Sequence, residues 1–169
     1  MITQDSIELQ IAWPIEQAAH AFPWTKSQLQ DQLKKKNANF GYWENEKLYG
    51  FICIQRIFPE AEILNIAMHP DHQRKGCGER LLHAVMLILK TEGFERMYLE
   101  VRKSNDAARR LYEKLAFNQI GERKNYYPAK NKREDATYST KSGFDKKEAE
   151  QLRIKTVIFV SKIKSLLNR

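Results

Sequence analysis

Residues Glu62–Leu82 read EILNIAMHPDHQRKGCGERLL, and this stretch decides the fold. It opens with the apolar run of a buried strand up to Met68 and closes on an apolar-periodic helix that starts near Leu81. Between them lies a turn rich in Pro, Gly, Arg and Lys. A strand that leads through such a loop into a helix N-terminus forms an anion site, because the first helical N–H groups have no partners and the helix dipole adds positive potential.

The loop itself indicates a phosphate-bearing ligand. Gly76 and Gly78 remove side chains where a phosphate approaches the backbone, while Arg74 and Lys75 supply positive charge. The loop lacks the Gly-Lys-Ser/Thr ending of a P-loop. It also lacks the third glycine of a dinucleotide-binding loop, because Leu81 stands there.

Length and composition fit one soluble globular domain. The 169 residues are 42% hydrophobic and 30% charged, which is ordinary for a chain with one core. The apolar runs are far shorter than the roughly 20 residues of a membrane span. The N-terminus lacks the basic and apolar regions of a signal peptide. Cys53 and Cys77 form no CxxC pair, so we expect free thiols in a cytoplasmic protein with no membrane contact.

The net charge of +8 is concentrated at the C-terminal end. Residues Asp145–Arg169 hold seven Lys/Arg and three Asp/Glu, which is half of the net charge. Such charge is more often a solvated surface than a binding site, so we expect no direct nucleic-acid function. The expected organisation is one domain over residues 1–144 and a basic, helical extension over 145–169, although Val157–Val160 equally reads as a strand. A surface helix on its own domain is the simpler interpretation, and a contact with a ribosome, membrane surface or partner is the alternative.

The other segments predict an α/β chain with a mixed sheet. Before the central strand we expect a strand over 6–12, a helix from Pro14 to Ala19, a helix after the capping box of Thr25 and Gln28, and a hairpin over 40–43 and 48–57. The central strand is followed by the helix after the glycine loop, which ends at Gly93. Then we expect a strand over 97–101, a helix capped by Ser104 and Asn105, a strand over 117–120 and a loop over 123–134.

Several motifs, in order from about residue 12 to 137, resemble one branch of the GNAT superfamily, the acyl-coenzyme A-dependent N-acetyltransferases. Gln73–Gly78 resembles their pyrophosphate loop. Leu99–Asn105 and Arg123–Pro128 resemble the RimI-type branch, which acetylates the N-terminal alanine of a small-subunit ribosomal protein. Ala19–Trp24 and Arg133–Ala136 match further markers of that branch. The resemblance implies a mostly antiparallel sheet flanked by helices, acetyl-CoA as co-substrate, no metal, and a ribosomal protein N-terminus as the partner.

The resemblance also implies two catalytic residues. Amide formation from a thioester needs a neutral amine, a polarised carbonyl and a proton for the departing thiolate. By resemblance Glu100 is the general base and Tyr112 is the acid that protonates the thiolate. Without the family, Glu100 would be an exposed strand residue paired with an arginine, and Tyr112 would be a core tyrosine.

Binding residues follow from the resemblance as well. The strand before the loop would bind the pantetheine arm and thioester, with the backbone N–H of Met68 as oxyanion donor. Asn105 would hydrogen-bond the coenzyme arm, with a purely structural N-cap as the alternative. The expected cofactor-binding residues are Ile66, Ala67, Met68, Arg74, Lys75, Gly76, Cys77, Gly78, Glu79 and Asn105. The expected residues of the peptide groove, unless they are packing aromatics, are Phe22, Trp24, Tyr126 and Tyr127.

Two departures from the family pattern and two rival functions remain open. Ala116 stands where the family has glycine, and an alanine with positive φ would be strained. Thr137–Lys141 replaces the usual apolar final strand, so we expect that strand to be lost or replaced by the tail. The first rival is a relative that acetylates lysine or a small amine. The second is a non-catalytic coenzyme A-binding or ribosome-associated module.

Overall fold

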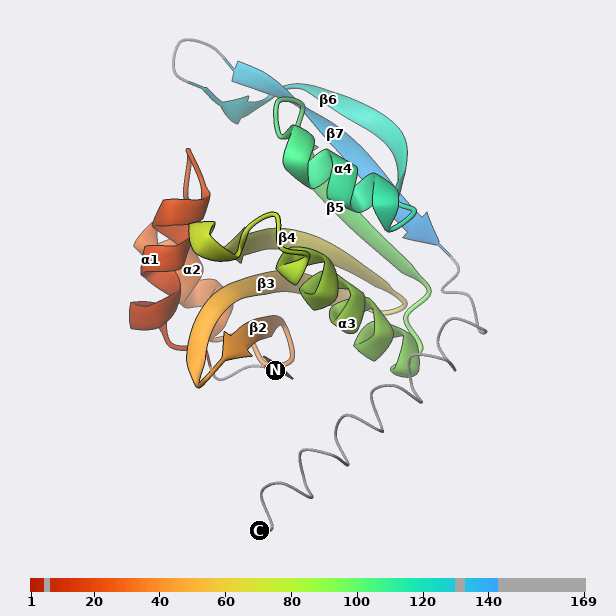
Figure 1. Cartoon of the computed structure of the whole chain (residues 1–169). Helices are drawn as coiled ribbons and strands as arrows, with labels where there is room; N and C mark the ends of the chain where they lie inside the picture. The colour runs from red at the N-terminus through yellow and green to blue at the C-terminus, as the bar shows by residue number, and fades with distance from the viewer. Residues whose placement is uncertain (5–6, 130–132, 143–169) are drawn as a thin grey trace.

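A computed structural model describes residues 1–4, 7–129 and 133–142 of the chain. The strands are β1 Ile2–Gln4, β2 Asn39–Glu44, β3 Lys47–Ile57, β4 Glu60–Met68, β5 Arg96–Arg102, β6 Asn118–Pro128 and β7 Arg133–Ser142. The helices are α1 Leu9–Ala19, α2 Lys26–Leu33, α3 Cys77–Thr91 and α4 Asp106–Lys114, with a 3₁₀ turn, η1, at Pro70–His72. The strands form one sheet in the order β1-β2-β3-β4-β5-β7-β6 (Figure 1). Each described neighbouring pair is antiparallel except β4–β5, which confirms the predicted mixed, mostly antiparallel sheet.

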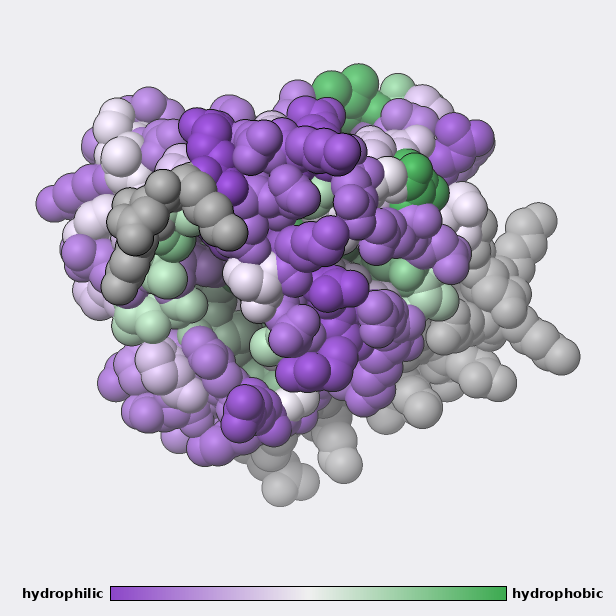
Figure 2. Space-filling view, turned by 90° about the horizontal axis from the view of Figure 1, so that it is seen from above, coloured by the Kyte–Doolittle hydropathy of each residue, from purple (hydrophilic) through white to green (hydrophobic). Residues whose placement is uncertain are grey.

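Helices cover both faces of the sheet. On one face α3 and α4 pack on β4 and β5, where Leu81 and Val85 of α3 are fully buried beside Leu99. On the other face α1 and α2 cover β3 and β4 through Ile15 and Leu29. Strand β6, at the end of the sheet, is mostly exposed to solvent, and the molecule seen from above is mostly hydrophilic (Figure 2).

The two parallel strands at the centre, β4 and β5, diverge. Their ladder ends at Ile63 and Leu99, although both strands continue beyond it. The cause lies in β4, where Leu64 is an extra residue between the pairs that Ile63 and Asn65 form with β3. A bulge of this kind bends and twists its strand, so β4 turns away from β5. The sheet is therefore split at its centre.

Several predicted local signals are confirmed. Thr25 accepts a hydrogen bond from the Gln28 N–H at 3.2 Å, and the Gln28 side chain accepts one from the Thr25 N–H at 2.8 Å. Gly93 follows α3 with a φ of +86°. Ala116 follows α4 with a φ of +59°, so this position, where the family has glycine, does require a positive φ. Helix α3 begins at Cys77, earlier than predicted, so Gly78 lies in its first turn and not in the loop.

Three predictions about elements are wrong. Residues 9–12 form the first part of α1 and not a strand, because Ala12 and Ile15 are buried at helical spacing and Pro14 lies inside the helix. Residues 123–128 belong to β6 and not to a loop. The final strand is not lost: β7 pairs with both β5 and β6. Its polar side chains form hydrogen bonds within the sheet. For example, the Thr137 hydroxyl donates to the Val101 carbonyl at 3.3 Å.

The predicted extension over 145–169 lies outside the described residues, so its helical form and the domain boundary at residue 144 stay predictions. Within the described part of the chain, no helix combines the length and the apolar character of a membrane span.

Candidate active site

A cavity of about 650 Å³ lies where β4 and β5 diverge. On the face that carries α1 it is lined by Glu16, Asn65 and Glu100. On the face that carries α4 it is lined by Ile66 and Tyr112. The cavity therefore passes through the split in the sheet. Two ligands that enter from opposite faces can meet inside it.

The backbone of β4 is directed into this split. Across the β3–β4 ladder, the His69 N–H donates to the Tyr49 carbonyl at 2.7 Å. Because successive N–H groups of a strand point to opposite edges, the N–H groups of Ile66 and Met68 point to the edge that faces the diverging β5. Met68 thus has the direction that an oxyanion donor requires. By the same alternation Ala67 directs its peptide groups toward β3, so its backbone does not reach the split.

The phosphate loop leads into an open helix N-terminus. Arg74 has a φ of +57° and Gly76, the N-cap of α3, has a φ of +74°. Gly76 supplies no side chain to cap the helix. The first-turn N–H groups thus point out of the helix end beside Arg74 and Lys75, an arrangement that fits a pyrophosphate. Any side chain at Gly76 would be strained by its positive φ.

The side chains of the first turn of α3 differ in what they offer a ligand. The Cys77 side chain is buried, so only its backbone is available. A Cβ on Gly78 would lie 3.5 Å from Met68 Cγ, which is an ordinary contact. The protein itself therefore leaves room for a methyl group at residue 78. Glu79 forms an ion pair with Lys114 at 2.7 Å, which ties α3 to α4.

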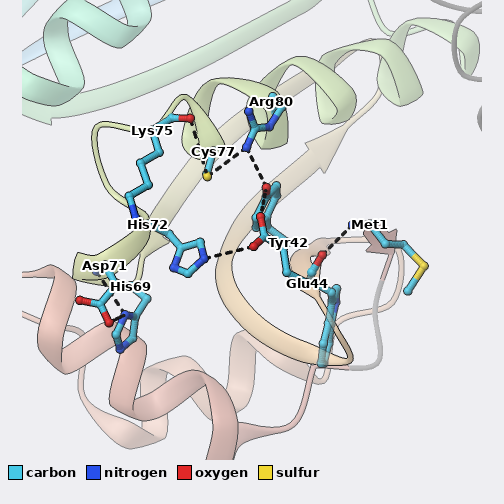
Figure 3. A network of polar contacts seen from close by, with 10 residues as sticks. Met1, Tyr42, Glu44, His69, Asp71, His72, Lys75, Cys77 and Arg80 are labelled. Atoms are coloured by element: carbon cyan, nitrogen blue, oxygen red, sulfur yellow. Dashed lines mark hydrogen bonds and ion pairs between the residues drawn. The ribbon is translucent and has the colours of Figure 1, made fainter.

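A polar network that sequence reasoning missed holds the loop against β2 (Figure 3). Arg80 donates to the Tyr42 hydroxyl at 2.8 Å, and that hydroxyl donates to Glu44 at 2.6 Å. Burial, together with the hydrogen bond to Glu44, raises the pKa of Tyr42 to about 12. The other Glu44 oxygen lies 3.3 Å from His72 Nε2. No sequence signal links these residues, because they come from β2, η1 and α3.

Glu100, the predicted base, lies at the split on the α1 face of β5. Its side chain is only 9% exposed. Its carboxylate forms an ion pair with Arg123, with Nε 2.8 Å from the nearer oxygen. The nearby Glu100 side chain, and next burial, raise the pKa of Tyr126. The pairing with an arginine, which was the alternative interpretation of Glu100, is thus present, but the pair stands at the cavity and not on an open strand.

Tyr112, the predicted acid, lines the cavity from α4 and is buried. Burial raises the pKa of Tyr112, and the neighbouring Tyr127 adds to this. Tyr127 also lines the cavity, and its hydroxyl donates to the Glu100 backbone carbonyl at 3.2 Å. Burial raises the pKa of Tyr127 to about 12. Asn105 lines the cavity too, and its side chain accepts from the Ala108 N–H at 3.1 Å, so it does cap α4.

A bulge in β6 places the paired tyrosines beside Glu100. The register between β6 and β7 shifts between Arg123 and Tyr127, and Asn125 has a φ of +53°. Asp135 of β7 accepts from the Asn125 N–H at 2.9 Å. Arg133 donates to the carbonyls of Asn125 and Tyr126. The Arg133–Ala136 motif therefore braces the strand segment that carries the tyrosines.

Arg102 connects the loop after α1 with β6 at the cavity. Its guanidinium lies 4.5 Å from the ring centre of Phe22, in the loop between α1 and α2, and 4.5 Å from that of Tyr127. It also donates to the Pro128 carbonyl at 2.8 Å. Three of the predicted groove aromatics, Phe22, Trp24 and Tyr127, line the cavity. The fourth, Tyr126, contacts Tyr127 edge-on, with their ring centres 4.9 Å apart.

A buried carboxylate that sequence reasoning missed fixes the same loop. Glu16 of α1 is 1% exposed and lines the cavity. It accepts hydrogen bonds from the Trp24 N–H and from the Asn65 side chain, both at 2.9 Å. His20 Nε2 lies 3.6 Å from it. The only available sequence signal was a glutamate on the buried side of an apolar helix.

Comparisons with known proteins agree with this geometry. Residues 7–117 match the family model described as the acetyltransferase (GNAT) family. The chain is 42% identical, over 78% of its length and 89% of the relative's, to the [ribosomal protein bS18]-alanine N-acetyltransferase of Escherichia coli strain K12. The crystal structure of the ribosomal-protein-S18-alanine N-acetyltransferase from Escherichia coli superposes with a TM-score of 0.76 at 39% identity, covering 86% of this chain and 98% of that one.

A more distant structure has the same fold. It is a GNAT family acetyltransferase from Elizabethkingia anophelis with acetyl-CoA bound, which has a TM-score of 0.71 at 22% identity and covers 85% of this chain and 97% of that one. A family model that matches most of the chain, a split central sheet and an open helix N-terminus after the glycine loop all agree. The chain belongs to the GNAT family of acetyltransferases.

Proposed function

We propose that this chain transfers the acetyl group of acetyl-CoA to the N-terminal α-amine of a protein that begins with alanine, namely ribosomal protein bS18. That reaction is the one in the names of its curated relatives, which it covers over most of their length. Ribosomal proteins are made in the cytoplasm, so we infer that the chain acts there.

The observation that carries this proposal is the cavity through the split sheet. The open N-terminus of α3 and the backbone of β4 offer a path for a phosphate-bearing thioester, while α1, the loop after it and β6 offer a groove for a peptide. A reaction between two such ligands needs them to meet, and the cavity between Glu100 and Tyr112 is where they can.

The two ends of the cavity suit opposite proton transfers. Glu100 presents a carboxylate on the acceptor side, where it can take the proton that the amine loses. Tyr112 keeps its proton at neutral pH, since burial raises its pKa. The same burial makes a departing thiolate more basic, because a low dielectric disfavours the charged form of both groups. Tyr112 can therefore protonate that thiolate, while the Met68 N–H stabilises the oxyanion.

An α-amine suits this site better than lysine. The pKa of an α-amine is about 7.7–8.0 and that of a lysine side chain about 10.4, so neutral lysine costs about 3.4 kcal/mol more at neutral pH. A single carboxylate base needs no further tuning for the α-amine. The rival that acetylates lysine or a small amine is served equally by the loop and Tyr112. The groove formed by Phe22, Trp24 and Tyr127 favours a peptide.

Two peptides of the same sequence test the proposal. Both contain one internal lysine; one has a free N-terminal alanine, and the other has the same N-terminus blocked. We expect acetylation of the free alanine and little of the blocked peptide, measured by mass spectrometry over time. Faster modification of the blocked peptide would overturn the N-terminal assignment, and no modification of either would favour the non-catalytic rival.

The same assay tests the base. We expect Glu100→Gln to lower the rate at neutral pH and to recover part of it as the pH rises through the pKa of the free α-amine, about 7.7–8.0, because solution then supplies the neutral amine. A pH profile that matches the unmodified protein would remove Glu100 from this role.

A further inference from the structure

A cation of the protein itself already contacts the predicted base. Arg123 Nε lies 2.8 Å from the Glu100 carboxylate in an ion pair, and its guanidinium carbon lies 5.3 Å from the ring centre of Tyr126 and 5.9 Å from that of Tyr138. The Arg123 side chain is 56% exposed, whereas that of Glu100 is 9% exposed. A largely exposed cation thus ends in a site formed by one sheltered carboxylate and two aromatic rings. We call Glu100, Tyr126 and Tyr138 the cation subsite.

The chemistry of the cation subsite fits an amine as well as a guanidinium. Carboxylates and aromatic faces both attract organic cations, and a primary ammonium group offers the same charge and N–H donors. Glu62, on the neighbouring strand, adds a second acidic group; burial, and next the negative charge of Glu100, raise its pKa. An acceptor that must bring its α-amine to Glu100 therefore meets a position that Arg123 occupies.

We propose that Arg123 is a built-in competitor of the acceptor: its guanidinium rests in the cation subsite and must leave before an acceptor amine reaches Glu100. This inference rests on the proposed function. Arg123 leaves without movement of the sheet, because its side chain is long and more than half exposed. Its departure costs every acceptor the same contacts. A peptide recovers them through the groove at Phe22, Trp24 and Tyr127, whereas a small amine has no chain to place there.

Arg123 therefore raises the KM of every acceptor, and small amines and free amino acids, which have no groove contacts to offset this cost, bind most weakly. An exposed ion pair and an exposed cation–π contact each correspond to roughly a two- to five-fold change in an equilibrium constant. Their combined loss is on the order of ten-fold. It appears in KM and not in kcat, because Arg123 is absent from the complex in which the reaction occurs.

The test compares Arg123→Met with Arg96→Met. Methionine keeps an unbranched apolar side chain and removes the charge. Arg96 is a matched control because it lies on the same sheet and its side chain is 53% exposed. It forms its ion pair with Glu60, at 3.2 Å, and not with Glu100. The substrates are an alanine-initiated peptide and alaninamide, which has the α-amine without a peptide chain. Both are assayed at saturating acetyl-CoA.

We expect Arg123→Met to lower KM for both substrates by roughly ten-fold, with kcat within about two-fold, and to make alaninamide a measurable substrate. We expect Arg96→Met to leave KM unchanged. An unchanged or higher KM in Arg123→Met would overturn the proposal. So would an equal fall in both variants, because a general charge effect would then explain it.

A direct binding measurement separates this inference from the proposed function. Alaninamide affinity is measured by NMR titration of the coenzyme A complex of each variant, which requires no turnover. If the unmodified protein acetylates no peptide, the proposed function fails, and tighter alaninamide binding by Arg123→Met still supports the competitor. Equal alaninamide affinity of the unmodified protein and Arg123→Met would contradict it.

Discussion

Replacing Ala116 by glycine should stabilise this protein. Ala116 has a φ of +59° and is exposed, so its methyl group contributes strain and little packing. An L-residue in the left-handed region costs about 1–2 kcal/mol. Glycine removes that cost but adds about 0.4–1 kcal/mol of unfolded-state entropy. The net gain is about 0.5–1 kcal/mol, which corresponds to a rise in Tm of about 1–4 °C for a chain of this size.

Thermal unfolding followed by circular dichroism measures this gain. Ala84→Gly is the matched control, because Ala84 lies in the middle of α3, where glycine costs about 1 kcal/mol. The two Ala→Gly substitutions should therefore shift Tm in opposite directions. A lower Tm for Ala116→Gly would refute the reasoning, since it would mean that the left-handed conformation costs this alanine less than the added chain entropy.

Three further predictions concern the site. Tyr112→Phe should lower kcat by roughly 10²–10⁴-fold with little change in acetyl-CoA affinity, because it removes a proton donor and keeps the packing; a near-normal kcat would make Tyr112 a core residue. Gly78→Val should abolish acetyl-CoA binding in calorimetry while Gly78→Ala still folds, since a methyl group there meets only ordinary contacts; unchanged affinity in a folded valine variant would remove the loop from the account. Asp135→Ala should raise the peptide KM, and Asp135→Asn less so, because the Asn125 N–H loses its acceptor; equal KM values in all three proteins would show that the bulge needs no brace.

The sequence predicted the parts of the fold that depend on local patterns. The run from Glu62 through the glycine loop gave the central strand and α3, and the capping box at Thr25 gave the start of α2. The strand expected over 6–12 was wrong because its short apolar pattern suited either periodicity, and the packing of Ile15 under the sheet decided for a helix. The prediction that the polar final strand, β7, is lost was wrong for a related reason. Its stability comes from two neighbouring strands that a local pattern does not contain.

The candidate site divides in the same way. The backbone features followed from the glycine loop, and the positions of Glu100 and Tyr112 followed from the family resemblance. The residues that arrange them were not predicted, because their contacts join distant parts of the chain. Arg102 reaches the loop at Phe22, and Glu16 reaches Asn65 across the α1–β4 interface. Such pairs are side-chain contacts between elements, and spacing along the chain carries no signal for them.

The most direct test of the account uses the whole acceptor protein. Ribosomal protein bS18 with an unmodified N-terminal alanine is incubated with this protein and acetyl-CoA, and its intact mass and its fragment masses are then measured. We expect a gain of one acetyl group, located on the first residue and formed more slowly when Glu100→Gln replaces the unmodified protein at neutral pH. An unchanged mass, or an acetyl group on a lysine side chain, would contradict it.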